Sequence, residues 1–259
     1  MSGTLVVNEV YLSLQGESTF AGLPCIFVRL TACNLRCSYC DTAYAFTEGR
    51  RREVADVHDE IRRIAAEMGA EMGPGSGARV VASDGPSGVH RLPLVEFTGG
   101  EPLLQPRAAA LMAALCDEGF TVLVETSGAH DIGVLDPRVR RIMDLKCPSS
   151  GEEARNRWAN VALLKATDEV KFVVGTWEDY AWMKSVLARE SLPSRCPVLV
   201  SWVAPLSGAQ QDPSLKRVPA GHRPLSRREL ADQVIADRLP VRFQLQMHKF
   251  VWPADARGV

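Results

Sequence analysis

The chain has 259 residues, of which 46% are hydrophobic and 24% are charged, a composition typical of a folded globular protein. Its 30 Lys and Arg residues balance 31 Asp and Glu residues, so no strong positive field exists to hold a nucleic-acid backbone. No apolar run approaches the roughly 18 residues that a membrane-spanning helix needs, and the first residues do not resemble a signal peptide. We therefore expect a cytoplasmic protein that binds neither nucleic acid nor a membrane.

Apolar runs and amphipathic stretches alternate along the chain, which is the pattern of an α/β fold. In chain order, strands are predicted over residues 6–12 and 25–30, a helix over 54–68, a strand over 94–97, a helix over 108–118, strands over 121–125, 141–145 and 169–174, a helix over 176–189, a strand over 197–202, a helix over 226–239 and a strand over 241–246. The last helix begins with a capping box formed by Ser226 and Glu229. Strands joined by helices form right-handed βαβ units, so we expect a parallel sheet core in a single domain over residues 1–259.

One segment does not fit this alternation. Residues 69–88 contain six glycines and two prolines but few large apolar residues. We interpret them as an exposed, flexible, Gly-rich insertion that extends to about residue 92.

Three cysteines occur within eight residues directly after the second predicted strand, in the spacing Cys33-x3-Cys37-x2-Cys40. A structural zinc site normally uses four protein ligands, and no fourth Cys or His lies at paired spacing. A [4Fe–4S] cluster has four irons, so three cysteines leave one iron open for another ligand. The spacing therefore favours an iron–sulfur cluster that takes part in chemistry.

The other four cysteines are interpreted separately. An odd total of seven cysteines in a cytoplasmic chain argues against a disulfide framework. Cys25, Cys116 and Cys196 are expected to be small buried residues, whereas the role of Cys147 is left open.

The cysteine spacing, with the aromatic Tyr39 before the last cysteine, resembles the signature of the radical S-adenosylmethionine (SAM) superfamily. The turn Thr-Gly-Gly-Glu-Pro at residues 98–102 resembles the second motif of that superfamily, in which glycine lets the backbone approach the amino group of SAM. The resemblance implies a partial, open β/α barrel with a [4Fe–4S] cluster whose open iron binds SAM. It also implies that reductive cleavage of SAM yields a 5′-deoxyadenosyl radical, which abstracts a hydrogen atom from the substrate.

Segments spread over nearly the whole chain resemble the 7-carboxy-7-deazaguanine synthase family. They are residues 8–17, 26–30, 40–42, 125–128, 144–150 and 245–249. The resemblance implies a carbon–nitrogen lyase that contracts the ring of 6-carboxy-5,6,7,8-tetrahydropterin to 7-carboxy-7-deazaguanine and releases ammonia, in 7-deazapurine (queuosine) biosynthesis. It further implies that SAM is regenerated, that Mg²⁺ is required, that flavodoxin or ferredoxin supplies the electron, and that the enzyme is a homodimer.

The same resemblance implies roles for individual residues. The cluster ligands are Cys33, Cys37 and Cys40, and the hydroxyl of Thr42 binds Mg²⁺, which prefers oxygen ligands. The residues expected to contact SAM are Tyr39, Cys40, Asp41, Gly100, Thr126, Lys146, Pro148 and Ser149. The residues expected to contact the substrate are Leu14, Gln15, Gly16, Glu17, Arg29, Thr98 and His248. No side chain is expected to be a catalyst in its own right, because SAM carries the radical.

The chemistry of the substrate suggests what these side chains do. Arg29 is expected to receive the substrate carboxylate, because a guanidinium group binds a carboxylate through two parallel hydrogen bonds. Gln15 and Glu17 are expected to read the donors and acceptors of the pterin ring. His248 is expected to hydrogen-bond the substrate from the last strand.

Three alternatives remain open from the sequence. Another compact radical SAM enzyme, such as a glycyl-radical activase, would share the cysteine loop but would not need Gln15, Glu17 or Arg29. A non-catalytic iron–sulfur carrier or zinc scaffold would leave the turn at residues 98–102 unexplained. A family member from a secondary-metabolite pathway would make the same product. The sequence departs from the family pattern at Ser127, where Asn or Gln is expected, and does not assign the tail at residues 252–259.

Overall fold

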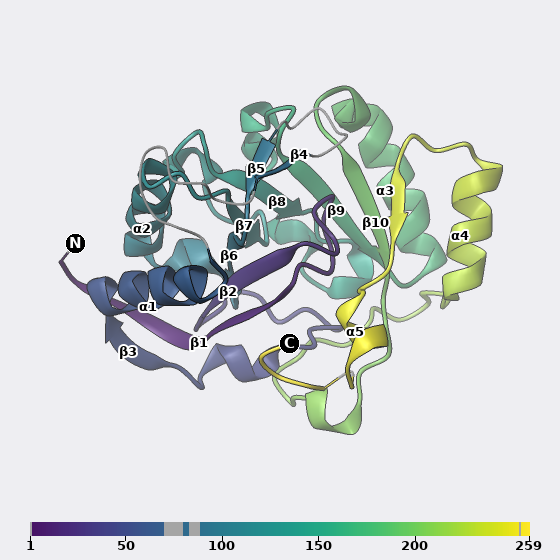
Figure 1. Ribbon diagram of the computed structural model, residues 1–259. Coiled ribbons are helices and arrows are strands. Elements are labelled where there is room, and N and C mark those ends of the chain that lie inside the picture. The colour runs from purple at the N-terminus through teal and green to yellow at the C-terminus, as the bar shows by residue number, and fades with distance from the viewer. Residues whose placement is uncertain (1, 70–79, 83–88, 254) are drawn as a thin grey trace.

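One mixed sheet of nine strands organises the computed structural model, which describes residues 2–69, 80–82, 89–253 and 255–259. The strands are β1 (Thr4–Leu14), β2 (Pro24–Leu30), β3 (Arg50–Glu53), β6 (Leu94–Gly99), β7 (Val122–Thr126), β8 (Arg140–Asp144), β9 (Glu169–Val174), β10 (Val198–Trp202) and β11 (Arg242–Gln244). They lie in the order β11-β10-β9-β8-β7-β6-β2-β1-β3 (Figure 1). Strands β2 and β6 to β11 run parallel, whereas β1 runs antiparallel to β2 and β3. The order begins at β11 and ends at β3, so the sheet forms an open barrel.

The described helices are α1 (Val54–Glu67), α2 (Pro106–Asp117), α3 (Trp177–Glu190), α4 (Arg227–Ala236) and the short α5 (His248–Val251). Helices α1 to α4 pack against the outer face of this sheet, whereas α5 lies at its inner side. Strand residues such as Phe97 and Phe172 share one large apolar core with helix residues such as Leu111 and Met183. Removal of this apolar surface from water is the main force that holds the two layers together.

The inner face of the sheet changes character along its strands. Leu94 on β6 and Leu123 on β7 belong to a smaller apolar cluster. Two residues further along each strand, and therefore on the same face, lie Glu96 and Glu125, and Asp144 follows the same pattern on β8. The inner face therefore has an apolar floor and a charged layer at the carboxyl ends of the strands.

Most predicted elements are found within a few residues of their expected positions, including β9 at its predicted bounds and the capping box at Ser226. The short β3 was not predicted, because its Arg-Arg-Arg-Glu sequence carries no apolar signal. The strand predicted over residues 241–246 is limited to three residues in β11. His248 therefore lies on α5 and not on the last strand, which corrects the expectation.

The glycine-rich segment is only partly described. Within it, β4 (Val80–Ala82) and β5 (Val89–Arg91) pair in a small antiparallel sheet that was not predicted. The remainder of the expected flexible insertion, residues 70–79 and 83–88, lies outside the described residues.

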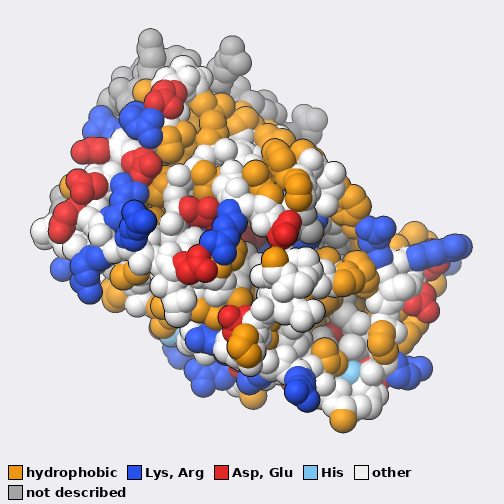
Figure 2. All heavy atoms as spheres, turned by 90° about the horizontal axis from the view of Figure 1, so that it is seen from below, with side chains coloured by type: hydrophobic (Ala, Val, Ile, Leu, Met, Phe, Trp, Pro, Cys, Tyr) orange, Lys and Arg blue, Asp and Glu red, His pale blue; other side chains and the backbone are white. Residues whose placement is uncertain are grey.

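On the face seen from below, side chains of both charge signs are interspersed (Figure 2). This mixture agrees with the near-zero net charge of the sequence. None of the helices in the described part of the chain has the length and apolar composition that a membrane crossing requires.

Candidate active site

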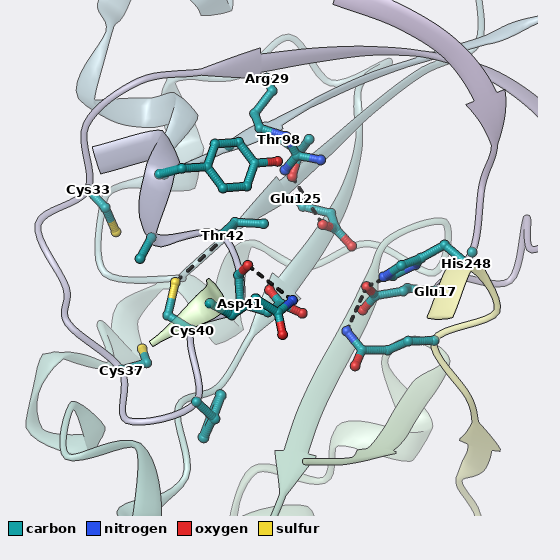
Figure 3. A pocket seen from close by; sticks show the side chains of 18 of the residues that line it. Glu17, Arg29, Cys33, Cys37, Cys40, Asp41, Thr42, Thr98, Glu125 and His248 are labelled. Atoms are coloured by element: carbon teal, nitrogen blue, oxygen red, sulfur yellow. Dashed lines mark hydrogen bonds and ion pairs between the residues drawn. The ribbon is translucent and has the colours of Figure 1, made fainter. Parts of the chain in front are cut away.

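A cavity of about 440 Å³ lies at the carboxyl ends of the parallel strands, the edge where α/β enzymes bind their ligands. The loop after β2, the segment after β1, strand ends of the central sheet and the region around α5 form its wall (Figure 3). The expected site residues that line it are Leu14, Gln15, Gly16, Glu17, Arg29, Cys33, Cys37, Tyr39, Cys40, Asp41, Thr42, Thr98, Gly100, Thr126, Lys146 and His248. The fold thus brings together residues from both ends of the chain.

The three cysteines of the predicted cluster lie on the loop between β2 and the 3-10 helix Ala43–Phe46 (Figure 3). All three thiols are free, and burial raises their pKa values, that of Cys40 to about 11. The ammonium group of Lys146 partly opposes this effect on Cys33 and Cys37, because it favours the thiolates. The loop is therefore suited to a positively charged centre that would draw the thiols into their ionised form.

The three cysteines of the loop face one open cavity. Within residues 2–69, 80–82, 89–253 and 255–259, no three His, Cys, Asp or Glu side chains converge closely enough to hold one metal ion. A four-iron cluster is wider than one ion, and three free cysteines around an open cavity offer it three ligands. The residues present therefore fit a [4Fe–4S] cluster with one iron left for another ligand.

Two glycines after β6 fix the base of the cysteine loop. Gly99 has a φ of +130°, and a Cβ atom there would lie 2.1 Å from the carbonyl oxygen of Leu30. A Cβ atom on Gly100 would lie 2.0 Å from the carbonyl oxygen of Ala32. Backbone N–H groups of Gly100 and Glu101 donate to these same carbonyls at 3.0 and 2.8 Å. The glycines are therefore required for close backbone packing under the cysteine loop, a reason that the sequence did not reveal.

We expect Gly100→Ala to displace the cysteine loop, because the added methyl group collides with backbone that cannot move independently. Overpacking of this kind costs about 1–3 kcal/mol of unfolding free energy. Iron content after anaerobic reconstitution and the unfolding midpoint should both fall. Gly208→Ala is the matched control, because no atom lies within 4 Å of the added Cβ. Equal iron content and stability in the two variants would contradict the prediction.

The glutamate of the same turn is a structural anchor. Glu101 is fully buried, and its carboxylate accepts hydrogen bonds from the backbone N–H groups of Leu103 at 2.9 Å and Ser127 at 2.7 Å. It also accepts from the hydroxyls of Ser127 at 2.5 Å and Thr126 at 2.9 Å. The carboxylate ties the end of β6 to the end of β7. It also gives the unexpected Ser127 a role, because its hydroxyl serves this anchor.

Arg29 projects from the end of β2 into the cavity (Figure 3). Its Nε donates to Glu9 Oε1 at 2.7 Å, and its Nη2 donates to the hydroxyl of Tyr11 at 2.8 Å. Within the described chain, the Nη1 group donates to no protein acceptor. The guanidinium plane is therefore held in place by protein contacts while donors remain for an anionic ligand.

The segment after β1 presents polar groups on the side of the cavity away from the cysteines (Figure 3). The carbonyl oxygen of the Gln15 side chain accepts from the backbone N–H of Glu17 at 2.9 Å, and its amide donates to Glu96 Oε2 at 3.1 Å. Glu17 Oε1 lies 3.0 Å from Gln246 Nε2 and 3.9 Å from His248 Nδ1. A Cβ atom on Gly16 would approach His248 Nδ1 to 3.1 Å, so glycine allows α5 to pack here. This packing places His248 beside Glu17.

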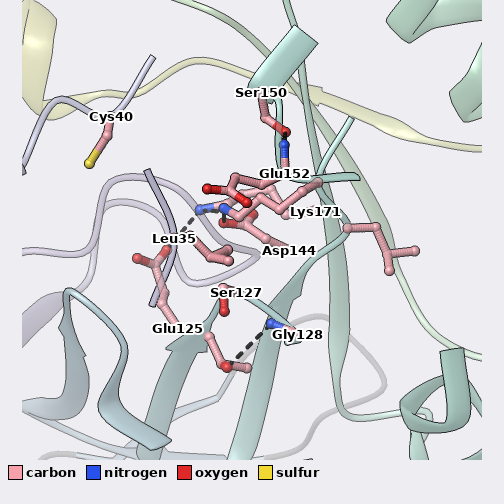
Figure 4. A network of polar contacts seen from close by, with 12 residues as sticks. Leu35, Cys40, Glu125, Ser127, Gly128, Asp144, Ser150, Glu152 and Lys171 are labelled. Atoms are coloured by element: carbon pink, nitrogen blue, oxygen red, sulfur yellow. Dashed lines mark hydrogen bonds and ion pairs between the residues drawn. The ribbon is translucent and has the colours of Figure 1, made fainter. Parts of the chain in front are cut away.

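Sequence reasoning missed the charged residue at the centre of the site. Lys171 on β9 lines the cavity, and its ammonium lies 3.1 Å from Glu125 Oε1 and 3.7 Å from Asp144 Oδ1 (Figure 4). A signal was present, because Glu169 and Lys171 occupy alternate positions of an otherwise apolar strand. Alternate strand positions share a face, so this pattern predicts a charged inner face.

Two residues expected at the SAM site do not line the cavity. Pro148 begins a 3-10 helix, and Ser149 is buried, with its backbone N–H and hydroxyl both donating to Asp179, at 2.7 and 2.5 Å. The Ser149 side chain is thus engaged with Asp179, and neither residue is at the cavity wall, where both were expected; their contact with SAM stays a prediction. Cys147 is also fully buried away from the cavity lining.

Other groups around the cysteine loop retain capacity for a ligand. The hydroxyl of Tyr39 is buried and has no hydrogen-bond partner within the described residues, although Tyr39 lines the cavity. Asp41 Oδ2 lies 2.5 Å from Lys249 Nζ, and Lys146 Nζ lies 2.6 Å from Asp144 Oδ2. A buried, unpartnered hydroxyl at a cavity wall is typical of a site completed by a ligand.

The C-terminal tail, which the sequence left unassigned, contributes to the cavity wall. The lining includes Asp255, Ala256, Arg257 and Val259. The Arg257 guanidinium lies 3.9 Å from the centre of the Tyr44 ring and pairs with Glu48 at 2.6 Å. These contacts hold the tail beside the cysteine loop.

Comparison with known proteins identifies the class. Residues 28–189 match the family model described as the Radical SAM superfamily. Because this match covers more than half of the chain, the protein belongs to the radical SAM superfamily, as the cysteine motif indicates. Such enzymes use a [4Fe–4S] cluster and SAM, as the resemblance of the cysteine loop also implies.

Full-length relatives narrow the assignment further. The chain is 37% identical to the 7-carboxy-7-deazaguanine synthase of Koribacter versatilis, over 98% of this chain and 99% of that protein. It is 40% identical to the corresponding synthase of Chlorobaculum tepidum, over 98% and 97% of the two chains. The protein belongs to the 7-carboxy-7-deazaguanine synthase family, which confirms the wider resemblance and does not favour a glycyl-radical activase. The crystal structure of QueE from Escherichia coli shares the fold, with a TM-score of 0.63, 21% identity and 95% coverage of both chains.

Proposed function

We propose that this enzyme converts 6-carboxy-5,6,7,8-tetrahydropterin into 7-carboxy-7-deazaguanine and ammonia, as a carbon–nitrogen lyase of 7-deazapurine biosynthesis. One observation carries the proposal. A single cavity wall joins three free cysteines to a fixed guanidinium group, Arg29, and to an ionised carboxylate, Glu17. A substrate that has both a carboxylate and a ring edge rich in N–H donors needs this pair of opposite charges. We also propose that the whole chain, residues 1–259, forms one domain.

The protein side chains bind and orient the substrate. Arg29 receives its carboxylate, because the guanidinium retains donors beyond those used by Glu9 and Tyr11. Gln15, Glu17 and His248 contact the ring edge, together with Thr98 and the backbone of residues 14 and 16. Thr98 is held by its hydrogen bond to Glu125 Oε2 at 3.2 Å.

The cofactors occupy the side of the cavity near the cysteine loop. Cys33, Cys37 and Cys40 would hold the [4Fe–4S] cluster. SAM would contact the residues expected for it that line the cavity, which are Tyr39, Cys40, Asp41, Gly100, Thr126 and Lys146. When bound, the cluster and SAM supply the radical that abstracts a hydrogen atom from the substrate. The Thr42 hydroxyl, at the cavity wall, would bind Mg²⁺, with the substrate carboxylate and water as further oxygen ligands.

The proposal includes partners that the sequence resemblance implies. Flavodoxin or ferredoxin supplies the electron, the enzyme acts as a homodimer in the cytoplasm, and it requires neither nucleic acid nor a membrane.

An anaerobic assay tests the proposed function. Reconstituted, reduced enzyme is mixed with SAM, Mg²⁺ and the carboxytetrahydropterin, and the products are identified by mass spectrometry. We expect 7-carboxy-7-deazaguanine in many turnovers per SAM consumed, and a Cys37→Ala variant should make none, because it lacks a cluster ligand. Formation of deoxyadenosine and methionine without the deazaguanine would refute the substrate while leaving the radical SAM class intact.

A further inference from the structure

On the inner face of the sheet, the ammonium group of Lys171 lies among several carboxylates. Lys171 Nζ lies 3.1 Å from Glu125 Oε1 and 3.7 Å from Asp144 Oδ1 (Figure 4). Lys171 Nζ also lies 3.2 Å from Glu17 Oε2. Its side chain is only 6% exposed. Glu96 lies nearby on β6, where it accepts from Gln15. Asp144 also pairs with Lys146 Nζ at 2.6 Å, so these four carboxyl groups share two ammonium groups. The position of Lys171 therefore helps to decide which of them is charged.

The surroundings of the carboxyl groups separate them into two kinds. Burial alone would raise the pKa of Glu17, but the charges of Lys171 and His248 outweigh burial and lower it to about 2. Burial and the neighbouring Glu125 raise the pKa of Glu96 well above its usual range. Burial also raises the pKa of Glu125. The site thus keeps Glu17 ionised while it resists further negative charge deeper in the cavity.

The two oxygens of Glu17 are held from different directions. Gln246 Nε2 contacts Oε1 at 3.0 Å, and Lys171 Nζ contacts Oε2 at 3.2 Å. Each carboxylate oxygen accepts about two hydrogen bonds, so each retains capacity toward the cavity that Glu17 lines. An aminopyrimidinone ring, as in a pterin, presents two adjacent N–H donors that match the two oxygens of one carboxylate.

We propose that Lys171 is a positioning residue, whose ammonium group holds the Glu17 carboxylate ionised and oriented to receive the paired N–H donors of the substrate's aminopyrimidinone ring. This inference rests on the proposed function and extends it, because it assigns recognition of that ring edge to a cation that does not itself touch the ring. The contact joins distant parts of the chain, since Lys171 and Glu17 are 154 residues apart in sequence.

The inference predicts a specific pH dependence. The groups that face Glu17 are Lys171 on β9, His248 and Lys249 on α5, and the carboxyls of Glu125, Asp144 and Glu96 on the central strands. In the wild type, Glu17 stays ionised above a pKa of about 2, so the KM for the pterin should not rise as the pH falls from about 8 to about 6. Without Lys171 the largest charge that opposes burial is lost, so the pKa of Glu17 should rise. Protonation at lower pH then removes an acceptor, and KM should increase.

The test compares Lys171→Met and Lys171→Gln with the wild type in the anaerobic assay. We expect KM for the pterin to rise about 10- to 100-fold at neutral pH, and further at lower pH, with a smaller change in kcat. Lys171→Gln keeps an N–H donor without the charge, so it should support the fold while showing the same pH dependence. In a double-variant cycle, Glu17→Gln should add less than about threefold to the loss already caused by Lys171→Met.

The controls separate this role from structural damage and from the proposed function. Lys184→Met is the control. Lys184 is an exposed residue of α3 that pairs with Asp237 at the end of α4, so its replacement should leave KM unchanged. A pH-independent rise in KM, or the collapse of both Lys171 variants, would overturn the inference and assign Lys171 to the fold alone. An unchanged KM would also overturn it, because Lys171 would then have no role in pterin binding. A wild type that makes no deazaguanine refutes the proposed function before any variant is compared. An active wild type with unaltered Lys171 variants refutes only the role of Lys171.

Discussion

Replacing Arg29 by Ala is expected to lower kcat/KM for the carboxytetrahydropterin about 100- to 1000-fold, because the substrate carboxylate loses its cationic partner. Cleavage of SAM without substrate should change less than about threefold, since the side-chain contacts of Arg29 are with Glu9, Tyr11 and Tyr44. Turnover and deoxyadenosine formation, measured by mass spectrometry in one reaction, give both quantities. Arg29→Lys should be intermediate, because it keeps the charge but not the paired donors.

The structure indicates that this variant should fold. Glu9, the ion-pair partner of Arg29, also accepts a hydrogen bond from the Tyr44 hydroxyl at 3.0 Å, so its carboxylate keeps a donor. Arg52→Ala is the matched control. Arg52 lies on the edge strand β3 and forms a similar ion pair with Glu60 at 2.6 Å, so its replacement should leave pterin turnover unchanged. If SAM cleavage and pterin turnover fall equally in Arg29→Ala, Arg29 does not act on the substrate.

Replacing Glu101 by Ala is expected to reduce the unfolding free energy by about 3–5 kcal/mol. The change leaves the buried donors of Leu103, Thr126 and Ser127 without their shared acceptor. Urea unfolding of the anaerobic holoenzyme measures the loss. Glu101→Gln should lower the unfolding free energy by less than Glu101→Ala does, because its amide oxygen still accepts hydrogen bonds. Some loss should remain, because its amide nitrogen is a donor that faces other donors.

A surface glutamate provides the comparison for this effect. Glu118 pairs with His58 at 2.5 Å and with Arg62 at 3.6 Å, but its side chain is 28% exposed. Glu118→Ala should therefore cost about 1 kcal/mol or less. Equal losses in the two alanine variants would show that the buried anchor contributes no more than a partly exposed ion pair.

Local patterns were sufficient to predict the elements and the cofactor class. The apolar run at residues 169–174 predicts β9 at its observed bounds, because a strand is encoded by neighbouring residues. The same holds for the capping box at Ser226, whose hydroxyl and whose partner Glu229 satisfy backbone donors as expected. The spacing of Cys33, Cys37 and Cys40 identifies the superfamily because all three ligands of the expected cluster lie on one loop.

Local patterns failed where a contact joins distant parts of the chain. Ser149 carries no local sign that Asp179 on α3 accepts from its hydroxyl, so its place at the cavity was wrongly expected. The charged triplet of β3 gives no apolar signal, because pairing with β1 alone makes it a strand. Likewise, the close packing that requires Gly99 and Gly100 depends on the backbone of Leu30 in β2 and of Ala32 after it, about 70 residues earlier in the sequence.

The sequence by itself determined the class of this protein, its cysteine loop and the residues of its polar motifs, since each is written in a few adjacent positions. Tertiary structure decided which charges meet. It placed Lys171 against Glu17, fixed Arg29 through Glu9 and brought the tail around Arg257 to the cavity. The physical reason is that burial and Coulomb interaction depend on distance in space, and the sheet order, not the chain order, sets those distances.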